Sequence, residues 1–295
     1  MSLPLALRSI LESPDGGALL ADADARAELC EWFPELEAGR GFEQPELHAF
    51  TVLDHNLATA TSFDEILGEG GRGSSFALRT AWLETGSLLD GEVGGVPIVA
   101  ATRLACLLHD IAKPATATFA DGRLRFPRHG PRGAELMAER LPRVGSNAEL
   151  TRFITSLIRY HLRPRELIQP WPPTNKAVSR FLRDLDGHML PLLLVNLCDG
   201  MATQGPRYTD AHFDRHLNFL NYVMSRVAEL DDRPGLKPLM TGHDLLTELG
   251  MESGRLVGAV LTSVLAAQSS GELTSREEAI AHARKALAEL EASSP

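Results

Sequence analysis

Hydrophobic residues recur along most of the chain at intervals of three and four positions, the spacing that gathers them on one face of an α-helix. The stretches in which this spacing is clearest are residues 103–112, 149–162, 176–185, 188–202 and 211–230. Pro114 and Pro164 closely follow two of these stretches. Because a residue before proline avoids the helical conformation, both prolines mark helix ends. The pattern therefore predicts a mainly helical protein.

The end of the chain has the same helical character. Residues 255–268 and 275–290 carry two more amphipathic patterns, and Gly250 is placed to close a shorter one as a C-terminal cap. Before the last helix we expect Thr274 to be the N-cap, with Glu277 three residues later completing a capping box. The tail is therefore expected to form helices of its own.

Strand signals are few. Residues 119–126 alternate around Asp121-Gly122, a pair that favours a two-residue hairpin turn. The expected fold class is therefore all-α, a helical bundle with a small hairpin insertion and a C-terminal helical extension.

The chain divides by pattern into three expected parts. These are a helical segment over residues 1–45, a central domain over residues 46–232 and a helical tail domain over residues 233–295. The sequence GEGGRGSS at residues 68–75 predicts a flexible insertion, and DDRPGLKP at residues 231–238 predicts a linker before the tail.

Composition and charge narrow the class of protein. Of 295 residues, 44% are hydrophobic and 23% are charged, which is typical of a globular protein. The formal net charge of -10 disfavours a broad basic face that coats nucleic acid. No apolar run is long enough to cross a membrane, and the N-terminus lacks the pattern of a secretory signal. The three cysteines suggest no disulfide framework, so we expect a cytoplasmic protein without a membrane partner.

Six histidine and aspartate residues fall at the ends of apolar stretches or on their buried faces. They are His55, His109, Asp110, His129, His161 and Asp199. His109 and Asp110 end the run CLLHD, and Asp199 ends the run LPLLLVNLCD. Since the apolar faces of helices point toward a core, we expect these polar side chains to point inward as well.

Buried carboxylates need a counter-charge. An ionised carboxylate without a partner is very costly in an apolar interior, and two are more so. Imidazole and carboxylate groups are good ligands for divalent cations. The six residues therefore favour a metal site over a set of unrelated core residues.

The order of these residues, H…HD…H…H…D, resembles the HD superfamily of metal-dependent phosphohydrolases. The additional histidines His129 and His161 resemble those of members that hold two metal ions, such as cyclic-nucleotide phosphodiesterases. Ala112 and Gly130 depart from the usual pattern, which often has glycine and glutamate at these positions. The resemblance implies divalent metal ions, two in number, whose identity the sequence does not distinguish.

Longer segments are similar to the C-terminal region of bacterial CCA-adding tRNA nucleotidyltransferases and poly(A) polymerases. They are residues 32–57, 104–116, 126–137, 157–164, 239–250 and 271–280. The catalytic head of that family, with its Gly-Gly/Ser turn and DxD metal pair, would precede residue 1. Gly16-Gly17 and Asp22-x-Asp24 imitate these motifs at too short a spacing. Nucleotide addition is therefore not expected.

The resemblance also implies roles for individual residues. His55, His109, Asp110 and Asp199 would hold one metal, and Asp110 (bridging), His129 and His161 the other. Asp110 and Lys113 are the candidate catalytic residues, with Lys113 also placed to bind a phosphoryl oxygen. Arginines cluster near the histidines at positions 128, 132, 159, 163 and 165. Of these, Arg128, Arg132 and Arg163 are the candidates for clamping phosphate.

The implied reaction is hydrolysis of a phosphoester by a metal-activated water. The resemblance implies a nucleotide or an RNA end as substrate, carrying a phosphomonoester or a 2′,3′-cyclic phosphate, and leaves tRNA as a possible partner. Two alternatives stay open: a non-catalytic RNA-binding relic of a CCA-adding enzyme, and a diiron oxygenase on the same ligand scaffold. The oligomeric state is not determined.

Two other groups are expected to support structure. His48 precedes His55 by seven residues, which would place it on the same helical face as a supporting histidine. His243-Asp244 opens a helix, where an aspartate is explained by capping.

Overall fold

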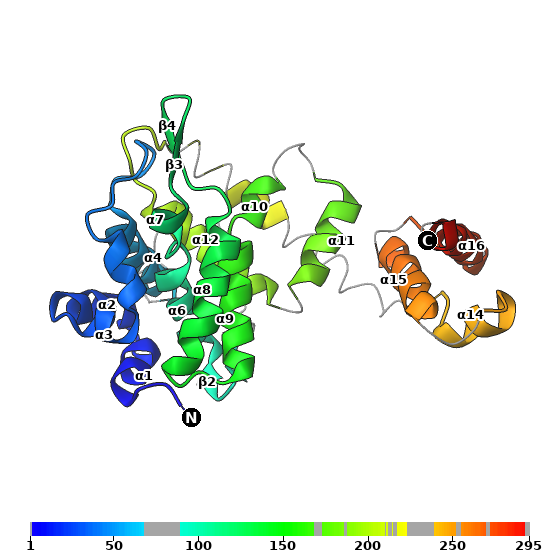
Figure 1. The fold of residues 1–295 in the computed structure, drawn as a ribbon, viewed down its shortest axis with the longest axis horizontal. Helices are drawn as coiled ribbons and strands as arrows, with labels where there is room; N and C mark the ends of the chain where they lie inside the picture. Colours follow the sequence, from blue (N-terminus) through cyan, green and yellow to red (C-terminus); the bar gives the residue numbers. More distant parts are fainter. Residues whose placement is uncertain are drawn as a thin grey trace. The chain divides into compact units, whose positions relative to one another are not determined.

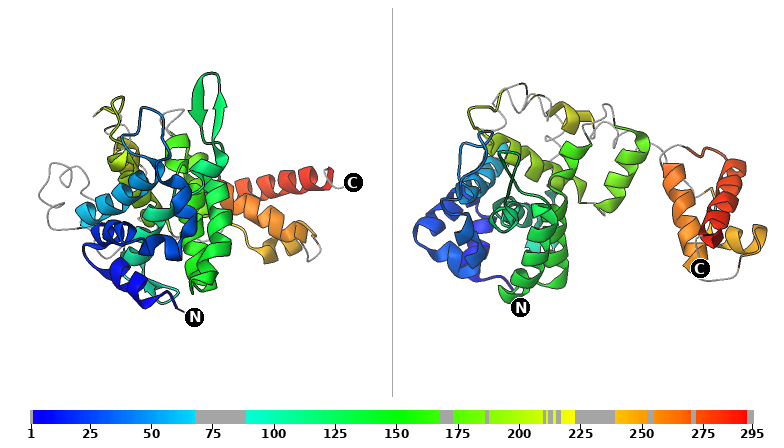
Figure 2. Two further views of the ribbon diagram at one scale, coloured as in Figure 1. Left: turned by 60° about the vertical axis from the view of Figure 1, so that its left-hand side comes forward. Right: turned by 45° about the horizontal axis from the view of Figure 1, so that its top comes forward.

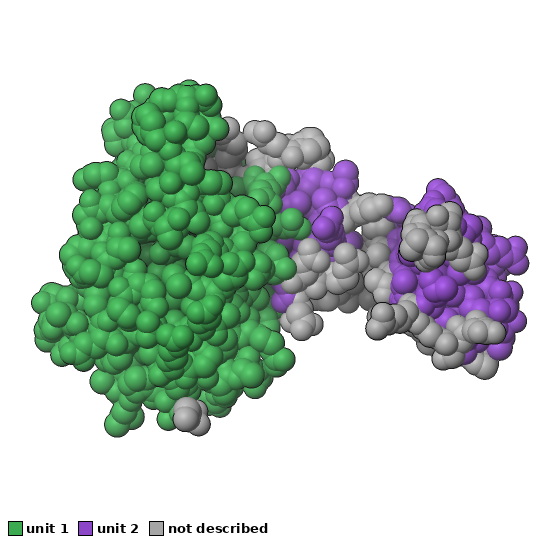
Figure 3. All heavy atoms as spheres, in the orientation of Figure 1, with its two compact units in different colours: residues 1–166, 188–222 green, residues 167–187, 223–295 purple. Residues whose placement is uncertain are grey.

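A computed structural model describes most of the chain in two compact units. The residues described are 2–67, 89–167, 173–185, 188–209, 211, 214, 217–222, 239–251, 255–269 and 272–292. Unit 1 comprises residues 1–166 and 188–222, and unit 2 comprises residues 167–187 and 223–295 (Figure 3). The expected flexible insertion at residues 68–75, the linker at 231–238 and most of the helix at 211–230 lie outside the described residues.

Unit 1 is a helical bundle with two short hairpins (Figure 1). Its helices are α1 (Leu5–Glu12), α2 (Gly16–Ala25), α3 (Glu28–Trp32), the 3₁₀ helix η1 (Pro34–Gly39), α4 (Val52–Leu67), α6 (Ile98–Leu108), α7 (Lys113–Thr116), α8 (His129–Arg143), α9 (Ala148–Tyr160), α10 (Arg163–Glu166) and α12 (Met189–Ala202). Its strands are β1 (Glu92–Val93), β2 (Val96–Pro97), β3 (Thr118–Ala120) and β4 (Arg123–Arg125). The all-α helical bundle expected from the sequence is confirmed.

The centre of unit 1 is formed by α4, α6, α9 and α12, which pack against one another. α6 is buried from Ala100 to Leu108, and α12 is buried from Leu190 to Gly200. Helices that are apolar on all sides must be enclosed by others, and here α8 covers α9 while α2 covers α4. The ligand-type residues at the ends of these helices are therefore held by the most buried part of the unit.

A buried arginine joins the N-terminal helices to this centre. Arg103 on α6 is 2% exposed, and its Nε donates to Asp64 Oδ1 at 2.8 Å. Its Nη1 donates to the carbonyl oxygen of Leu11 at the end of α1. Asp64 also accepts from the backbone nitrogen of Gly17 at 2.6 Å. A buried charge is tolerated when it is paired in this way, so Arg103 holds α1 and α2 against the bundle.

The hairpin expected around Asp121-Gly122 is present as β3 and β4. The antiparallel strands pair Thr118 with Arg125 and Ala120 with Arg123. Asp121 and Gly122 have φ angles of 52° and 69°, the left-handed values that a tight two-residue turn requires.

A second hairpin, β1–β2, was not anticipated. Val93 pairs with Val96 around Gly94 and Gly95, whose φ angles are 60° and 78°. Asn147, the N-cap of α9, donates from Nδ2 to the carbonyl oxygen of Gly94 at 2.8 Å. The Gly-Gly pair was the available signal, but strands of two residues are too short to show alternation.

Unit 2 contains α11 (Asn175–Asp184), α14 (Gly242–Glu248), α15 (Arg255–Ser269) and α16 (Arg276–Ala292). The core of α14–α16 includes Met240, Leu245, Val260, Val264, Ala279 and Ala283. Thr241 and Asp244 form a capping box at the start of α14, which confirms the capping interpretation of Asp244. Gly250 lies just beyond α14 with a φ angle of 65°, as expected of a C-terminal glycine.

The capping box expected at Thr274 and Glu277 is wrong by one position. Ser275 Oγ accepts from the backbone nitrogen of Glu278, and Glu278 Oε2 accepts from the backbone nitrogen of Ser275 at 3.1 Å. The sequence does not show which residue is the N-cap, because Glu277 and Glu278 are adjacent and either could complete a capping box. The structure decides it, because α16 begins at Arg276.

The domain boundaries expected at residues 45/46 and 232/233 stay a prediction. Among the described residues, no helix combines the length and the hydrophobicity that a membrane span needs.

Candidate metal centre

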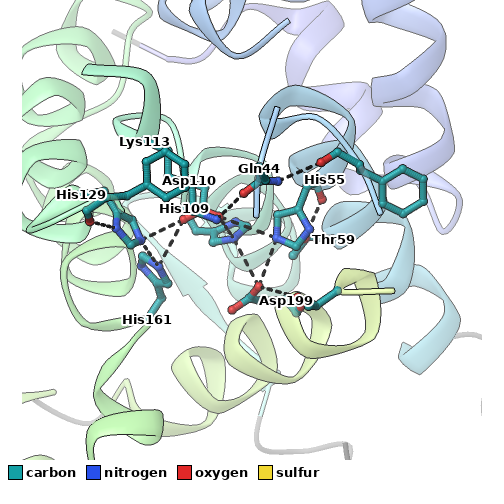
Figure 4. Close-up of polar contacts among 12 residues, drawn as sticks. Gln44, His55, Thr59, His109, Asp110, Lys113, His129, His161 and Asp199 are labelled. Atoms are coloured by element: carbon teal, nitrogen blue, oxygen red, sulfur yellow. Dashed lines mark hydrogen bonds and ion pairs between the residues drawn. The ribbon is translucent and has the colours of Figure 1, made fainter. Parts of the chain in front are cut away.

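The six ligand-type residues come from different elements and meet inside unit 1 (Figure 4). His55 lies on α4 and Asp199 on α12, while His109 and Asp110 occupy the turn between α6 and α7. His129 is the first residue of α8, and His161 directly follows α9. Each of the six is at most 6% exposed. The convergence expected from the sequence is present.

Three of the histidine rings are fixed by the backbone three residues before them. The Nδ1 atoms of His109, His129 and His161 lie 2.8, 2.7 and 2.7 Å from the carbonyl oxygens of residues Cys106, Phe126 and Ile158. A carbonyl oxygen can only accept a hydrogen bond, so each Nδ1 carries a proton and donates it. In a neutral ring this leaves a lone pair on Nε2, the tautomer of a metal-ligating histidine.

The donor atoms form two groups of three. His55, His109 and Asp199 make one group, and Asp110, His129 and His161 make the other. Within each group the potential ligand atoms lie within 4.8 Å of one another. An ion held by three protein ligands has positions open for water or substrate, as in catalytic metal sites.

Asp110 faces both groups, one with each carboxylate oxygen. Its Oδ1 lies 3.1 Å from His129 Nε2 and 3.5 Å from His161 Nε2. Its Oδ2 lies 3.2 Å from His109 Nε2 and 3.7 Å from His55 Nε2. A carboxylate in this position can bridge two ions, one on each side.

The arrangement of lone pairs fits bound cations. The Nε2 atoms of His129 and His161 lie 3.2 Å apart. Two lone pairs at this distance repel each other unless a proton or a metal ion lies between them. Ligands at about 2.1 Å from one ion, separated by angles near 90–110°, would be roughly 3.0–3.4 Å apart. Buried His109 Nε2 and Asp110 Oδ1 also have no hydrogen bond among the described residues. The residues present therefore fit divalent metal ions.

The aspartates stay charged despite their burial. Burial alone would raise the pKa of Asp110, but the neighbouring His109 and Lys113 hold it well below its usual value. Burial likewise opposes ionisation of Asp199, whose pKa is held well below its usual value by Arg165 and His55. The centre thus keeps two negative charges that attract cations.

The pKa values of the buried histidines shift in different directions. Burial lowers the pKa of His161 to about 4, against the opposing effect of the nearby Asp110 carboxylate. Burial also lowers the pKa of His55. For His109, burial is outweighed by the negative charge of Asp110, and its pKa rises to about 9. In the absence of a metal, His109 therefore carries a second ring proton near neutral pH.

Lys113 lies next to the bridging carboxylate. Its Nζ is 2.5 Å from Asp110 Oδ2 and donates to Gln44 Oε1 at 2.7 Å. Gln44 in turn donates from Nε2 to the carbonyl oxygen of Phe50 at 3.1 Å. Gln44 was missed because it precedes the helical pattern and carries no ligand-type group. It fixes the ammonium group beside the metal site.

A cavity of about 230 Å³ opens beside Asp110 and Asp199. Its other lining residues are Pro45, Leu47, His48, Lys113, Phe126, His129, His161, Leu162 and Arg165. Arg165 lies 3.3 Å from Asp199 Oδ2, with its side chain 34% exposed. The cavity therefore places two cations, Lys113 and Arg165, opposite the two aspartates.

His48 lines this cavity, although it does not lie on the helix of His55. α4 begins at Val52, and His48 occupies the turn before it. Its ring contacts that of His55 edge to face, with centroids 4.9 Å apart. Burial and the nearby charge of Lys113 lower the pKa of His48 to about 3. It belongs to neither group of metal ligands, which agrees with a supporting role.

The arginines expected to clamp phosphate do not line the cavity. Arg128 and Arg132 line a separate surface hollow, and Arg132 pairs with Glu135 at 3.1 Å. Arg163 lies 3.8 Å from Glu166. Arg128 lines this separate hollow, whereas the adjacent His129 lines the cavity. Arg165 takes the position expected of a clamp, and the spacing of the arginines could not distinguish them.

Gly17 and Asp24 imitate a motif of the nucleotidyltransferase head, and Gly130 departs from the HD pattern. Packing and ion pairing explain these residues. Gly17 lies in α2, where a Cβ atom would be 2.4 Å from the carbonyl oxygen of Ala60. A Cβ at Gly130 would be 3.0 Å from the carbonyl oxygen of Arg159. Asp24 also lies in α2 and pairs with Arg40 at 2.7 Å. The close approach of helices, therefore, explains both glycines.

Comparison with known proteins places these observations in a family. Residues 88–194 match the HD domain family, so this part of the chain is an HD domain. It is 27% identical over 251 residues to the CC-adding tRNA nucleotidyltransferase of Thermus thermophilus, covering 84% of this chain and 48% of that protein. It is 28% identical over 283 residues to the A-adding tRNA nucleotidyltransferase of Deinococcus radiodurans, covering 95% and 56%. The chain thus spans about half the length of the curated relatives it matches.

Proposed function

We propose, from the HD domain that this chain contains, that it is a metal-dependent phosphohydrolase acting on the phosphoester of a nucleotide or an RNA end. The bond broken is a phosphomonoester or a 2′,3′-cyclic phosphate. The observation that carries the proposal is the position of Asp110, which has one carboxylate oxygen beside the buried pair His129 and His161 and the other beside His109 and His55 of the second group. This geometry suits a pair of divalent ions at the end of an open cavity.

In this proposal, one set of residues holds the metal ions and another binds the phosphate. His55, His109 and Asp199 would hold one ion and His129 and His161 the other, with Asp110 shared. Ions bound there would lower the pKa of a water molecule and draw negative charge from phosphoryl oxygens. Lys113 Nζ and the Arg165 guanidinium border the cavity and would bind the non-bridging oxygens by charge-assisted hydrogen bonds.

The substrate class is supported by the relatives and by the cavity. Both relatives are named as tRNA nucleotidyltransferases, which makes an RNA partner a reasonable proposal for this chain. The cavity is open on one side of a buried metal centre, so a terminal phosphate can enter while the rest of a larger molecule stays outside.

The proposal includes a division of the chain. Residues 1–45 would be a helical neck-like segment, residues 46–232 the HD domain and residues 233–295 a helical tail. The HD family match at residues 88–194 falls within the central part.

The experiment is metal analysis followed by an activity panel. Purified protein should contain about two divalent ions per chain, and should hydrolyse phosphomonoesters or 2′,3′-cyclic nucleotides. Asp110→Ala should lose activity by at least about a thousandfold, because both ions lose a shared ligand. Asp90→Ala, which removes an exposed aspartate away from the centre, is the matched control and should keep full activity. Activity that survives in Asp110→Ala would overturn the proposal.

A second candidate is a non-catalytic RNA-binding protein, favoured by the similarity to tRNA enzymes. Protein that binds tRNA and carries metal but hydrolyses no member of the panel would support it. A diiron oxygenase would instead show coloured, iron-loaded protein and consumption of dioxygen.

A further inference from the structure

The β3–β4 hairpin carries an exposed aromatic residue that packs against no core. Phe119 is 76% exposed, the most exposed aromatic side chain among the described residues. The ribbon extends away from the helices of unit 1 (Figure 1 and the left view of Figure 2). An isolated two-stranded ribbon is marginally stable in water, and an apolar side chain at its surface stabilises it little. Its ring is therefore accessible for contact with a ligand.

The pairing register separates two faces of the hairpin. Phe119 pairs with Leu124, while Thr118 pairs with Arg125 and Ala120 with Arg123. Because paired residues of antiparallel strands lie on the same face, Phe119 and Leu124 share one face and the two arginines the other. The hairpin therefore presents an apolar face and, on the opposite side of the ribbon, a cationic face.

Charge around the hairpin is opposite in sign to that of the whole chain. The chain has a net charge of -10, but residues 117–135 contain four arginines, one aspartate and one glutamate. Arg125 lies 3.3 Å from Asp121 and Arg132 lies 3.1 Å from Glu135, so the segment keeps an excess of two positive charges. Arg123, Arg125, Arg128 and Arg132 are all exposed. Such a local concentration of positive charge in an acidic protein favours a polyanionic ligand at this surface.

The residues that follow the hairpin in the sequence lead to the metal cavity. Phe126 directly follows β4 and lines the cavity, with its ring 5.5 Å from Lys113 Nζ. Arg128 and Arg132, at the start of α8, line a hollow with Thr116 of α7. Lys113 of the same short helix lines the metal cavity. The hollow and the cavity are therefore both lined by α7 and the start of α8.

We propose that the β3–β4 hairpin and the start of α8 bind single-stranded RNA and guide its end toward the metal cavity. Bases stack on Phe119, and the arginines of the hairpin and of α8 contact successive phosphates. This combination of an aromatic platform with cationic side chains is what single-stranded nucleic acid requires. Taking the strand's end as the substrate rests on the proposed function, whereas the binding surface stands on the hairpin itself.

The test is binding of a fluorescein-labelled single-stranded RNA of about twelve nucleotides, followed by fluorescence anisotropy on the full chain. The RNA ends in a 3′-hydroxyl, so that no hydrolysis is needed. Phe119→Ala should weaken binding by about tenfold, because it removes a stacked base, and Phe119→Trp should restore it. Leu5→Ala is the matched control, since Leu5 is an 81% exposed hydrophobic residue on α1, and should bind as wild type does.

The contribution of the arginines is measured separately, through the salt dependence of RNA binding. The double variant Arg123→Ala with Arg125→Ala should lower the slope of log affinity against log salt concentration by about 0.7 for each lost phosphate contact. Arg152→Ala, an exposed arginine on α9, should leave the slope unchanged.

Three results would overturn the inference. They are no RNA binding by wild-type protein, unchanged affinity in Phe119→Ala, and a change of oligomeric state rather than of RNA affinity in that variant. The last would identify the apolar side of the hairpin as a contact between copies. Failure of wild-type protein to hydrolyse small phosphoesters would count against the proposed function alone, because anisotropy does not depend on catalysis.

Discussion

At the scale of single residues, hydrogen bonds to the backbone decide which ring nitrogen of three histidines is free to bind a metal. His109, His129 and His161 each direct Nδ1 to a backbone carbonyl, so their Nε2 atoms converge on Asp110. The residue types and their order were sufficient to predict which six candidate ligands would come together. They could not predict which neighbours orient the groups, such as Gln44 and Arg165, because glutamine and arginine are common on surfaces.

The division into two groups predicts a specific change in metal content. His129→Ala should lower the bound metal from about two ions per chain to about one, because it removes a ligand of one group only. Elemental analysis after gel filtration gives the stoichiometry. His48→Ala is the matched control: it removes a cavity histidine that is in neither group, and should keep both ions. Loss of an ion in the control would show that the grouping is incorrect.

Metal uptake should release a proton. The pKa of His109 in the metal-free protein is about 9, so the ring is protonated at pH 7.5 and must lose that proton to bind a metal. The proton is released on binding below about pH 9, and metal affinity should therefore rise with pH up to that value. Calorimetric titrations of metal-free protein in two buffers of different ionisation enthalpy measure the release. Identical heats in both buffers would contradict it.

At the scale of secondary-structure elements, several candidate ligands lie at the ends of helices, and these ends meet at one place. α6 ends just before His109, α8 begins at His129 and α9 ends just before His161. Helix ends were predictable because prolines and caps act locally. The β1–β2 hairpin and the register of the α16 cap were not, since strands of two residues and adjacent acidic residues carry ambiguous patterns. Close packing between elements, as at Gly17 against α4, also has no local signal.

The packing of α2 on α4 predicts a loss of stability in Gly17→Ala. The added Cβ would lie 2.4 Å from the carbonyl oxygen of Ala60, so the helices must separate, at a cost of about 1–3 kcal/mol. Thermal unfolding should show a lower midpoint. Gly258→Ala in α15 is the comparison, because its Cβ would meet no atom within 4 Å. Alanine there should be neutral or stabilising by up to about 1 kcal/mol, and a similar loss in both variants would argue against the packing explanation.

On the scale of the whole molecule, the chain contains two units with separate cores. The metal centre lies entirely within unit 1, and the α14–α16 core lies within unit 2. A ligand that binds only the folded form of one unit stabilises that unit by mass action. The metal should therefore affect the two units differently.

Chelation should lower the stability of unit 1 selectively. Free metal at about a thousandfold above its dissociation constant contributes about 4 kcal/mol, which corresponds to roughly 8–16 °C for a unit of this size. Differential scanning calorimetry before and after dialysis against a chelator should shift one transition and leave the α14–α16 transition in place. Restoring the divalent metal should reverse the shift. An unchanged profile would mean that no metal contributes to the fold.

The sequence by itself determined the helical class, the β3–β4 hairpin and the six residues of the metal centre. Periodicity, turn glycines and residue order are properties of neighbouring positions, so they can be read without coordinates. Only the tertiary structure decided that Asp110 faces two groups, that Gln44 holds Lys113, and that Arg165 enters the cavity in place of Arg128 and Arg132. These contacts depend on the direction in which side chains leave elements far apart in the chain, and that direction is set by packing.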